Sequence, residues 1–456
     1  SGVEWLGEVP GHWAIARFSR VIAAIKDGTH GTFQRVAEGR PLLSAKNVLN
    51  GHLDIGGAES LISDSDHAEI VANGFPRKGD LLLTIVGTIG RACVYEEIEP
   101  FAFQRSVCFI RLQKELSPHF FYYFFQSKFF QEQLVGKSKS SAQAGVYMGD
   151  VASTSILFPR DENEQTAIVT FLVRETTKLD ALVAEQEKLI ALLQEKRQAV
   201  ISHAVTKGLD PNVPMKDSGV EWLGEVPAHW VVCALRRVIA AIEQGWSPEC
   251  YAREAEEQEW GVLKAGCLNG GNFRPSENKA LPPELPPEEA YEVRVGDVLM
   301  SRASGSPELV GSTALVKATR ERLMLSDKIF RLKLKEFVNA AFFVAALNSR
   351  PLRIQIENAL SGGNGMANNL PQSSLLTFAM AVPPLAEQAT ITGFLEQETA
   401  KLDTLTAEAR SAITLLQERR TALISAAVTG HIDVRGLAGG VHAPDLIAAS
   451  AYAVSA

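Results

Sequence analysis

Two long segments of this sequence occur twice. Residues 1–28 recur as residues 218–245 with 19 of 28 positions identical, and residues 164–210 recur as residues 387–433 with 26 of 47 identical. The offset between the copies grows from 217 to 223 residues, so each half encloses a middle segment of its own between two shared ends. Two copies with so long a period indicate a duplicated two-domain protein rather than a solenoid of short repeats.

The middle segments of the two copies differ in sequence, and both are predicted to contain strands. Only short fragments align, namely residues 77–80 with 294–297 and residues 109–112 with 329–332. Short apolar runs beside glycines, at residues 80–86 and 297–301, predict strands. The ends of the two copies therefore repeat while the middles have diverged.

Helices are fewer in the middle segments. Residues 118–133 and 339–348 are apolar enough to predict helices that are buried on more than one face. Six consecutive aromatic residues at 120–125 could suggest a surface that stacks on nucleic-acid bases. At helical density such a cluster is far more often core, so we assign it to the hydrophobic core.

The second repeated block predicts a long helix in each copy. Residues 164–205 contain no Gly or Pro and are rich in Ala, Leu, Glu, Gln and Lys, which predicts a helix of roughly 60 Å at 1.5 Å per residue. Leucines recur along both copies at the spacing typical of a coiled-coil seam. The predicted seam residues are Leu172, Leu179, Leu182, Leu189, Leu193, Leu395, Leu402, Leu405, Leu416 and Leu423.

One such helix alone could not bury its apolar stripe, but two could bury each other. We expect them to pair antiparallel, which places Glu175 near Arg419 and Glu398 near Lys196. The alternative is two unrelated surface helices, each packed on its own domain. The predicted fold class is α+β, with two mixed α/β domains separated by two long helices that pack as an antiparallel coiled coil, in a pseudo-twofold tandem duplication.

The repeats also predict where one segment ends and the next begins. Two prolines and a glycine after the first helix are typical of a linker, and an Ala/Gly/Ser-rich tail that we expect to be mobile follows the second helix. The predicted segments are a first globular domain at 1–160, a first helix at 161–207, a linker at 208–217, a second globular domain at 218–385, a second helix at 386–430 and a C-terminal tail at 431–456.

Composition and charge exclude several classes of protein. Of the 456 residues, 46% are hydrophobic and 21% are charged, which is typical of a folded chain. The 45 Lys and Arg against 53 Asp and Glu give a net charge of −8, so this chain does not coat nucleic acid by net charge alone.

The sequence shows no sign of export or of membrane insertion. No run approaches the ~18 apolar residues that a membrane-spanning helix needs, and Glu4 and Glu8 stand where a secretion signal would be basic. The five cysteines are odd in number and never spaced C-x-x-C, so we expect free thiols and no zinc site. We therefore expect a cytoplasmic protein without membrane partners.

No catalytic motif has the required spacing. Residues 136–138 (GKS) end like a phosphate-binding loop, but Gln131 stands where its first glycine belongs. None of the nine histidines lies in an H-E-x-x-H motif, and no glycine-rich cofactor loop is present. We predict that this chain catalyses nothing and binds no metal.

The repeated motif at residues 2–13 and 219–230 (GVEWLGEVPxHW), together with residues 383–388 (PPLAEQ), carries a family resemblance. Over residues 1 to about 434 the chain resembles the specificity (S) subunits of type I restriction-modification systems. The first copy departs from the family pattern at residues 159–164, where the Pro-Pro-Leu form is missing.

The resemblance implies both an architecture and a set of partners. The two globular domains would be target recognition domains, each reading one half of a bipartite double-stranded DNA site. The helices would act as a spacer and dock two methyltransferase (M) subunits, and motor-nuclease (R) subunits would complete the complex. S-adenosylmethionine, ATP and Mg would belong to those partners, and this chain would need no cofactor.

Side chains that can read bases occur in polar, Gly-containing loops of both middle segments. In the first copy we predict DNA contacts by Thr29, His30, Thr32, Gln34, Arg35, Lys46, Asn47, Thr88, Arg91, Gln104, Arg105, Lys137 and Lys139. In the second copy we predict contacts by Lys264, Asn269, Asn272, Arg274, Arg302, Ser304, Lys328, Asn364, Asn368 and Asn369. The basic loop that carries Lys137 and Lys139 is expected to meet phosphate rather than a base edge.

The sequence alone is also compatible with two other functions. A coiled-coil adaptor without DNA readout would keep the helices but give the divergent middles no role in choosing a DNA sequence. An enzyme in its own right is disfavoured by the missing motifs.

Overall fold

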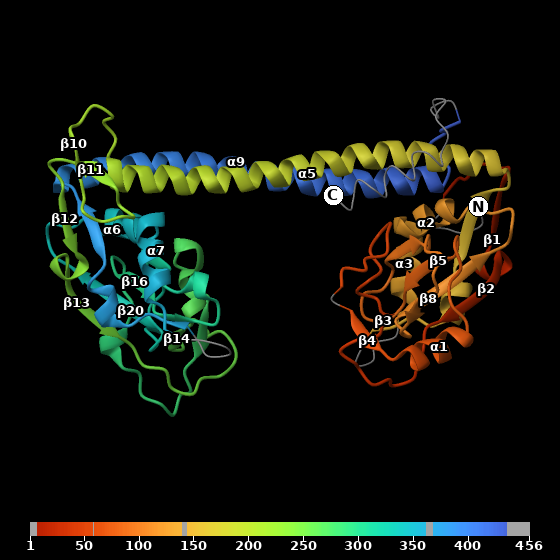
Figure 1. The fold of residues 1–456 in the computed structure, drawn as a ribbon, viewed down its shortest axis with the longest axis horizontal. Coiled ribbons are helices and arrows are strands. Elements are labelled where there is room, and N and C mark those ends of the chain that lie inside the picture. Colours follow the sequence, from red (N-terminus) through yellow and green to blue (C-terminus); the bar gives the residue numbers. More distant parts are fainter. Residues whose placement is uncertain (1–6, 58, 139–143, 362–367, 436–456) are drawn as a thin grey trace. The chain divides into compact units, whose positions relative to one another are not determined.

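The computed structural model describes residues 7–57, 59–138, 144–361 and 368–435, and the chain divides into two compact units. Unit 1 comprises Ser1–Glu187 and Arg410–Ala456, and unit 2 comprises Lys188–Ala409. Each unit therefore contains one globular part and a segment of each long helix (Figure 1). Residues Lys139, Asn364 and 436–456 lie outside the described residues.

Unit 1 is built on a four-stranded antiparallel sheet of order β2-β8-β5-β6. A three-stranded sheet of order β4-β3-β7 and the pair β1-β9 complete its β-structure. Its elements are β1 (Trp13–Arg17), η1 (Phe18–Arg20), β2 (Ile22–Asp27), β3 (Arg40–Leu43), β4 (Ser60–Ile62), α1 (Asp64–Ala72), β5 (Leu81–Thr84), β6 (Ala92–Val94), β7 (Ala102–Phe103), β8 (Val107–Leu112), α2 (Pro118–Gln126), α3 (Lys128–Lys137), α4 (Met148–Ala152), β9 (Ser155–Pro159) and the start of α5 (Glu162–Lys207).

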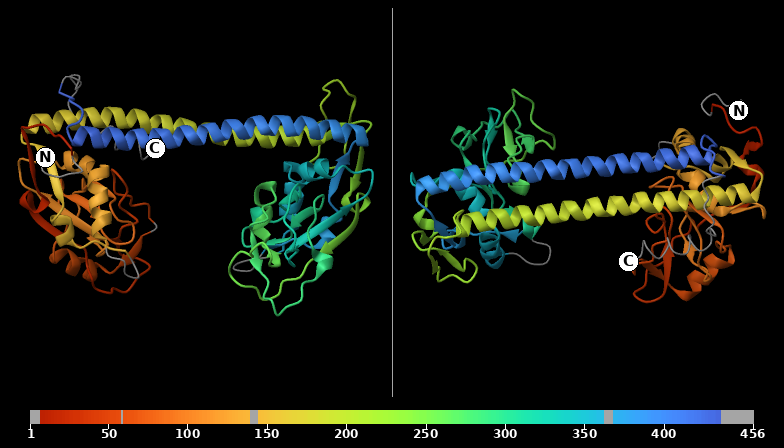
Figure 2. Two further views of the ribbon diagram at one scale, coloured as in Figure 1. Left: turned by 180° about the vertical axis from the view of Figure 1, so that it is seen from behind. Right: turned by 90° about the horizontal axis from the view of Figure 1, so that it is seen from above.

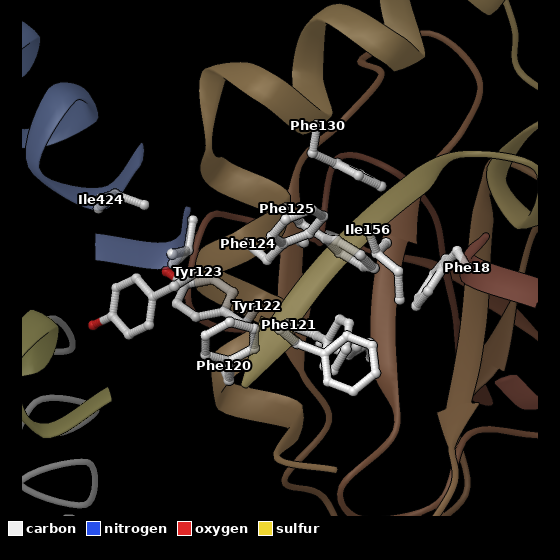
Figure 3. Close-up of a cluster of buried hydrophobic side chains, with 14 of the residues drawn as sticks. Phe18, Phe120, Phe121, Tyr122, Tyr123, Phe124, Phe125, Phe130, Ile156 and Ile424 are labelled. Atoms are coloured by element: carbon white, nitrogen blue, oxygen red, sulfur yellow. The ribbon is translucent and has the colours of Figure 1, made fainter. Parts of the chain in front are cut away.

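The aromatic run of α2 forms the core of unit 1, as predicted. All six aromatic residues from Phe120 to Phe125 are buried, and Phe18 stacks on Phe121 at 5.8 Å between ring centroids. Ile424 of α9 (Leu385–Val428) belongs to the same cluster (Figure 3). The predicted helix at 118–133 is in fact two helices, because the Ser127 hydroxyl caps a second helix by accepting a hydrogen bond from the Phe130 amide.

Unit 2 repeats the strand order of unit 1. Its four-stranded sheet has the order β13-β20-β16-β18, its three-stranded sheet β15-β14-β19, and its end pair is β12-β22. Its strands are β10 (Met215–Asp217), β11 (Glu225–Pro227), β12 (Val231–Ala234), β13 (Ile239–Gln244), β14 (Gly261–Leu263), β15 (Asn278–Ala280), β16 (Val298–Ser301), β17 (Ala303–Ser304), β18 (Thr313–Leu315), β19 (Leu323–Met324), β20 (Ile329–Leu334), β21 (Asn368–Asn369) and β22 (Ala379–Val382).

The helices of unit 2 follow the same plan. The α-helices are α6 (Ala340–Leu347), α7 (Arg350–Ala359) and α8 (Gln372–Leu375), and the 3-10 turns are η2 (Leu235–Arg237), η3 (Ala265–Gly271), η4 (Glu289–Tyr291) and η5 (Pro307–Leu309). Strand β10 pairs with β11, so part of the segment predicted as a linker is a β-hairpin. The divergent middles thus share one fold.

The strand registers correct one predicted alignment between the copies. Ile25 pairs with Ile110, and its repeat counterpart Ile242 pairs with Leu332. Ile110 therefore corresponds to Leu332, whereas the sequence fragments had matched it to Phe330. Sliding a strand by two residues keeps every side chain on the same face, so the hydrophobic pattern could not detect this shift.

A cation on β8 or β20 meets an aspartate at the start of the neighbouring strand in both units. Arg111 pairs with Asp80 at 2.6 Å, and the hydrogen bonds to Asp80 raise the pKa of Arg111. In unit 2 the corresponding Lys333 lies 3.6 Å from Asp297. The repeated Gly-Asp fragment thus has a structural role in each sheet.

The last glycine of the first repeated block marks a close approach of two chain segments. A Cβ at Gly28 would lie 2.2 Å from the Phe103 carbonyl oxygen, and a Cβ at Gly245 would lie 2.0 Å from that of Leu325. Only glycine fits such a contact. The loops that differ between the two copies begin directly after this fixed point.

Within each unit the two helix segments run antiparallel (Figure 2). In unit 1 Trp13 contacts both Glu164 at the start of α5 and Gly430 just after the end of α9. In unit 2 Trp230 makes the equivalent contacts with Glu387 at the start of α9 and Gly208 after α5. This confirms the predicted antiparallel pairing, and packing of each helix on its own domain alone describes neither unit.

The ion pairs between the helices differ from those predicted. Arg420 pairs with Asp180 at 2.9 Å in unit 1, and Arg197 pairs with Asp403 at 3.3 Å in unit 2. Glu175 instead binds Arg174 and Lys178 of its own helix, and Glu398 binds Lys401 of its own helix. Within one helix, cations one turn or less away reach these glutamates first.

Only part of the predicted leucine seam is buried. Leu172, Leu179, Leu193, Leu395 and Leu402 are buried, and Leu416 and Leu423 are half-buried. Leu182, Leu189 and Leu405, which occupy the companion position of the heptad, are between 41% and 50% exposed, so the prediction that they lie in the seam is wrong. Two paired helices bury most of the residues that face the partner helix and leave those at the companion heptad position at the open edge.

A clamp of three side chains holds the start of each long helix. In unit 1 the Trp13 indole donates a hydrogen bond to Glu164 at 3.0 Å, and His12 lies 2.9 Å from the same carboxylate. The equivalent side chains of unit 2, His229, Trp230 and Glu387, make the same contacts at 2.8 and 3.0 Å. The repeated His-Trp pair and the repeated glutamate therefore occur together because they bind each other.

The described residues include all five cysteines, and they also bear on membrane insertion and metal binding. All five cysteines are free, and Cys93, Cys108 and Cys267 are buried. Among the described residues no helix has the length and hydropathy needed to cross a membrane. The same part of the chain holds no group of three His, Cys, Asp or Glu side chains placed to bind a metal ion.

Candidate nucleic-acid interface

Three loops of unit 1 meet at one end of the β4-β3-β7 sheet, which lies away from the helix segments (Figure 1). The Thr29 amide donates to the Phe103 carbonyl at 2.7 Å, and the Gln104 amide donates to the Leu43 carbonyl at 2.8 Å. The Arg105 amide in turn donates to the Thr29 carbonyl at 3.0 Å. Three predicted DNA contacts, Thr29, Gln104 and Arg105, are therefore neighbours on rigid backbone.

The turn after β5 joins the same place. The Ile85 amide donates to the Ser106 carbonyl at 2.9 Å, and the Ser106 hydroxyl accepts from the Ala45 amide at 3.0 Å. These bonds bring the loops at 44–47 and 85–91 beside Arg105. They carry the predicted contacts Lys46 and Thr88, which are exposed, and Arg91, which is half-buried.

The loop after β2 borders a small hollow of about 290 Å³ in unit 1. Thr29, His30 and Phe33 line it, and His30 lies 2.8 Å from Asp27. The remaining predicted contacts of this loop are exposed, namely Thr32, Gln34 and Arg35. The loop thus places polar side chains around an aromatic-lined depression.

Two predicted contacts of unit 1, Asn47 and Lys137, make hydrogen bonds within the unit. Asn47 is 3% exposed, and its amide holds its own loop by accepting from the Ser44 amide at 2.9 Å and donating to the Asp54 carbonyl at 3.0 Å. The Asn47 amide thus stabilises its own loop, and its contact with DNA stays a prediction. Lys137 lies at the end of α3 and donates to the Ser153 hydroxyl at 2.9 Å.

In unit 2 a short two-stranded ribbon gathers five of the predicted contacts. Strand β17 pairs with β21, with Ser304 opposite Asn368 and Ala303 opposite Asn369. The Arg302 amide donates to the Lys328 carbonyl at 2.9 Å. We call Arg302, Ser304, Lys328, Asn368 and Asn369 the ribbon cluster.

The other predicted contacts of unit 2 follow β14 and lie on or near η3. Lys264 pairs with Glu277 at 3.7 Å, and Arg274 donates to the Gly266 carbonyl at 2.7 Å. Asn269 is half-buried, and Asn272 lines a hollow of about 1110 Å³ whose wall includes α5 and α9 residues. These four residues thus lie on or beside η3 rather than on the β17-β21 ribbon.

A loop of unit 2 that residue types did not single out is fixed by charge. Arg253 binds Glu259 through two hydrogen bonds of 2.6 Å. These bonds lower the pKa of the Glu259 carboxyl to about 2. The pair closes the loop between β13 and β14, which corresponds to the Thr29–Arg35 loop of unit 1.

Sequence reasoning missed the residues that anchor the start of the long helix to the globular part of unit 1. The clamp residues His12, Trp13 and Glu164 were read only as parts of repeated motifs. Gln165 was not singled out either, although its buried amide accepts from the Ser117 amide at 2.8 Å and donates to the Pro159 carbonyl at 2.9 Å. The signal that could have found them is identity at equivalent positions of both copies.

Comparisons with known proteins point in one direction. A family model described as the type I restriction modification DNA specificity domain matches residues 41–191. The chain is 29% identical over 254 residues to the type I restriction enzyme EcoEI specificity subunit of Escherichia coli, a match that spans 55% of this chain and 42% of that relative. It is 23% identical over 458 residues to the StySPI specificity subunit of Salmonella potsdam, spanning 97% of this chain and 93% of the relative.

One solved structure shares the fold of the chain. It is described as "Structural basis underlying complex assembly and conformational transition of the type I R-M system", and the match has a TM-score of 0.62 at 16% identity. The match covers 93% of this chain and 100% of that one. The two-unit fold with long helices is therefore also found in a type I system.

Proposed function

Because this chain belongs to the family of type I restriction-modification specificity subunits, we propose that it selects the DNA sequence on which such a complex acts. Each unit reads one half of a bipartite site in double-stranded DNA. The chain itself is non-catalytic, and it works in the cytoplasm.

The observation that carries this proposal is one scaffold with two different sets of polar loops. The sheets of both units have the same strand order. The side chains at equivalent positions differ. Thr29, Gln104 and Arg105 of unit 1 correspond to Trp246, Ser326 and Asp327 of unit 2, and Arg302 of unit 2 corresponds to Ile85 of unit 1. Two readers of one shape with different side chains fit a DNA site made of two different halves.

The long helices supply the spacer and the docking surface in this proposal. Both helices continue from one unit into the other, with 46 residues in α5 and 44 in α9. Leu182, Leu189, Leu192, Leu405 and Leu415 are exposed along them. Exposed apolar side chains on helices are candidates for a protein interface, and two methyltransferase (M) subunits are the partners we infer.

The chemistry belongs to the partners in this proposal. Adenine methylation with S-adenosylmethionine is assigned to the M subunits, and ATP- and Mg-dependent DNA cleavage is assigned to motor-nuclease (R) subunits. We assign no cofactor and no membrane contact to this chain.

Selection from a randomised duplex library tests the proposal. The chain together with its M subunit should enrich two short sequences separated by a gap of fixed length. The matched control is the M subunit alone, which should enrich no such pair. Enrichment that does not depend on this chain would favour the adaptor without DNA readout and would overturn the proposal.

A further inference from the structure

Resting on the proposed function, we propose that Arg302 reads a guanine in the half-site contacted by unit 2. Its two terminal guanidinium nitrogens would donate hydrogen bonds to O6 and N7 of that base. This assigns one base type to one side chain, which the proposed function alone does not.

The Arg302 guanidinium has no acceptor among the described residues. Its Nε is buried and makes no hydrogen bond, and no ion pair to Arg302 is present in the described part of the chain. A buried donor without a partner is costly, and most such groups in proteins are paired. The side chain is half-buried, and no hydrogen bond to its two terminal nitrogens is present among the described residues, so these two donors are the ones that a base could engage.

The surroundings hold this guanidinium in place. The Arg302 Cζ lies 5.5 Å from the centre of the Phe330 ring, a cation–π distance. The Arg302 amide donates to the Lys328 carbonyl, and the Arg302 carbonyl accepts from the Leu370 amide at 2.8 Å. The backbone bonds fix the main chain of Arg302, and the contact with Phe330 restricts its guanidinium, which reduces the entropy that the side chain loses on binding.

The corresponding position in unit 1 does not need an arginine. Ser301 pairs with Ile329 and Thr84 pairs with Val107, so Ile85 occupies the place of Arg302. Ile85 is 3% exposed and belongs to the hydrophobic core. The fold therefore accepts an aliphatic side chain here, and a cation in unit 2 has a purpose other than holding the sheet.

The strand pair beside this position is also more polar in unit 2 than in unit 1. In unit 1 the equivalent contact is the bridge from Val86 to Gly145. In unit 2 Ala303 faces Asn369, and the adjoining pair is Ser304 and Asn368. Polar side chains with donors and acceptors thus gather beside Arg302 in one unit only.

The geometry favours guanine among the four bases. A guanidinium presents two parallel N–H donors, and guanine alone presents two acceptors, O6 and N7, side by side in the major groove. A phosphate would also accept from Arg302, but it would give no sequence preference. The two outcomes can therefore be separated by experiment.

The test uses the chain with its M subunit and the DNA site that this complex selects. Each guanine of the unit 2 half-site is replaced in turn by 7-deazaguanine, which lacks the N7 acceptor, and binding is measured by titration. One such replacement should weaken wild-type binding by roughly 5- to 150-fold. R302A should weaken binding to the unmodified site similarly and lose its sensitivity to that replacement.

Two further variants serve as controls. R302I places the unit 1 side chain at this position and should fold, which thermal unfolding checks, yet lose the same guanine preference. Arg294→Ala removes an arginine that is mainly exposed and lies 3.7 Å from Glu292, and it should keep the wild-type pattern.

Three outcomes are informative. Unchanged base preferences in R302A would overturn this inference and leave the proposed function standing. A uniform weakening on all sequences would do the same, because it indicates a phosphate contact. A wild-type complex without any sequence preference would instead overturn the proposed function.

Discussion

Side chains that are identical in both copies connect the globular part of each unit to the start of its long helix. Trp13 is 8% exposed, and its indole N–H has Glu164 as its acceptor. The carboxylate lies in the first turn of α5, where negative charge is also favoured by the helix dipole. This explains why two separate repeated blocks have kept partner residues.

We predict that Glu164→Ala lowers the free energy of unfolding of the chain by about 1–3 kcal/mol, because it leaves the Trp13 N–H buried without an acceptor. Urea unfolding measures the change. The control is Glu162→Ala, which removes an exposed carboxylate from the same helix turn and should cost less than about 0.5 kcal/mol. Equal losses in the two variants would show that the clamp contributes nothing beyond helix charge.

The buried thiols predict a dependence on pH. Burial raises the pKa of Cys93 and of Cys267 from 9.0 to about 12. Because the unfolded thiols ionise first, their contribution to stability is complete below pH 9 and is lost as the pH rises toward 12. At pH 8 we expect iodoacetamide to modify half-buried Cys233 and Cys250 before Cys93 and Cys267, as read by mass spectrometry. Equal modification rates in the folded chain would contradict this.

Residue types identified the polar loops but not the role of each side chain. Thr29, Gln104 and Arg105 lie in such loops, and the backbone hydrogen bonds that make them neighbours were not predicted. Asn47 has the same chemistry as a base reader, yet its amide holds its own loop. An asparagine that bonds its own backbone cannot be distinguished in sequence from one that reads a base.

At the scale of elements, the long helices were predicted to within two residues at each end. The helix at 161–207 is α5 (162–207), and the helix at 386–430 is α9 (385–428). Glycines and prolines punctuate these ends clearly in the sequence. The pairing partners were not predicted, because heptad spacing does not specify which of two neighbouring arginines faces the partner helix.

A double-mutant cycle on Asp180 and Arg420 tests that pairing. We expect a coupling of roughly 0.5–1 kcal/mol in urea unfolding, typical of a largely exposed ion pair. The control is Arg419→Ala, which removes the exposed neighbour that heptad spacing had indicated. A coupling of Asp180 with Arg419 rather than with Arg420 would mean that the helices pair in another register.

Helix length should determine the distance between the two half-sites. Asp180 and Arg197 are 17 residues apart on α5, and so are their partners Asp403 and Arg420 on α9. We predict that four residues inserted near Ala184 lengthen the recognised spacer and leave both half-sequences unchanged, because the insertion adds about 6 Å of helix. Sequencing of methylated DNA measures this.

The control inserts the same four residues in the loop at 209–212, outside the helices, and should leave the spacer as it is. Altered half-sequences at an unchanged spacer would contradict the role of the helices. A third variant with a matching insertion in α9 between Asp403 and Arg420 restores the equal spacing of the ion-pair residues on the two helices. It should therefore unfold at a higher urea concentration than the single insertion.

At the scale of the whole molecule, each copy of the duplicated sequence contributes helix residues to the core of both units. The core of unit 1 includes Ile424 and Val428 from the second copy, and the core of unit 2 includes Ile201 and Val205 from the first. Each compact unit therefore consists of one middle segment and helix segments from both copies. Boundaries drawn along the sequence could not show this, because the exchange involves segments that are more than 200 residues apart.

The net charge of −8 excludes non-specific coating of DNA by this chain, but it does not exclude the reading of bases. Base reading needs a few well-placed donors, whereas tight binding to DNA needs many phosphate contacts. We infer that the partner subunits supply much of that second contribution. An acidic total is thus compatible with a chain that selects sequence within a larger complex.

The most direct test of two independent readers is the methylome of cells that produce this chain with its M subunit. Wild type should give one bipartite motif, and a chimera in which residues 29–112 come from a relative should change one half of the motif and keep the other half and the spacer. A chimera that changes both halves, or neither, would contradict the assignment of one half-site to each unit.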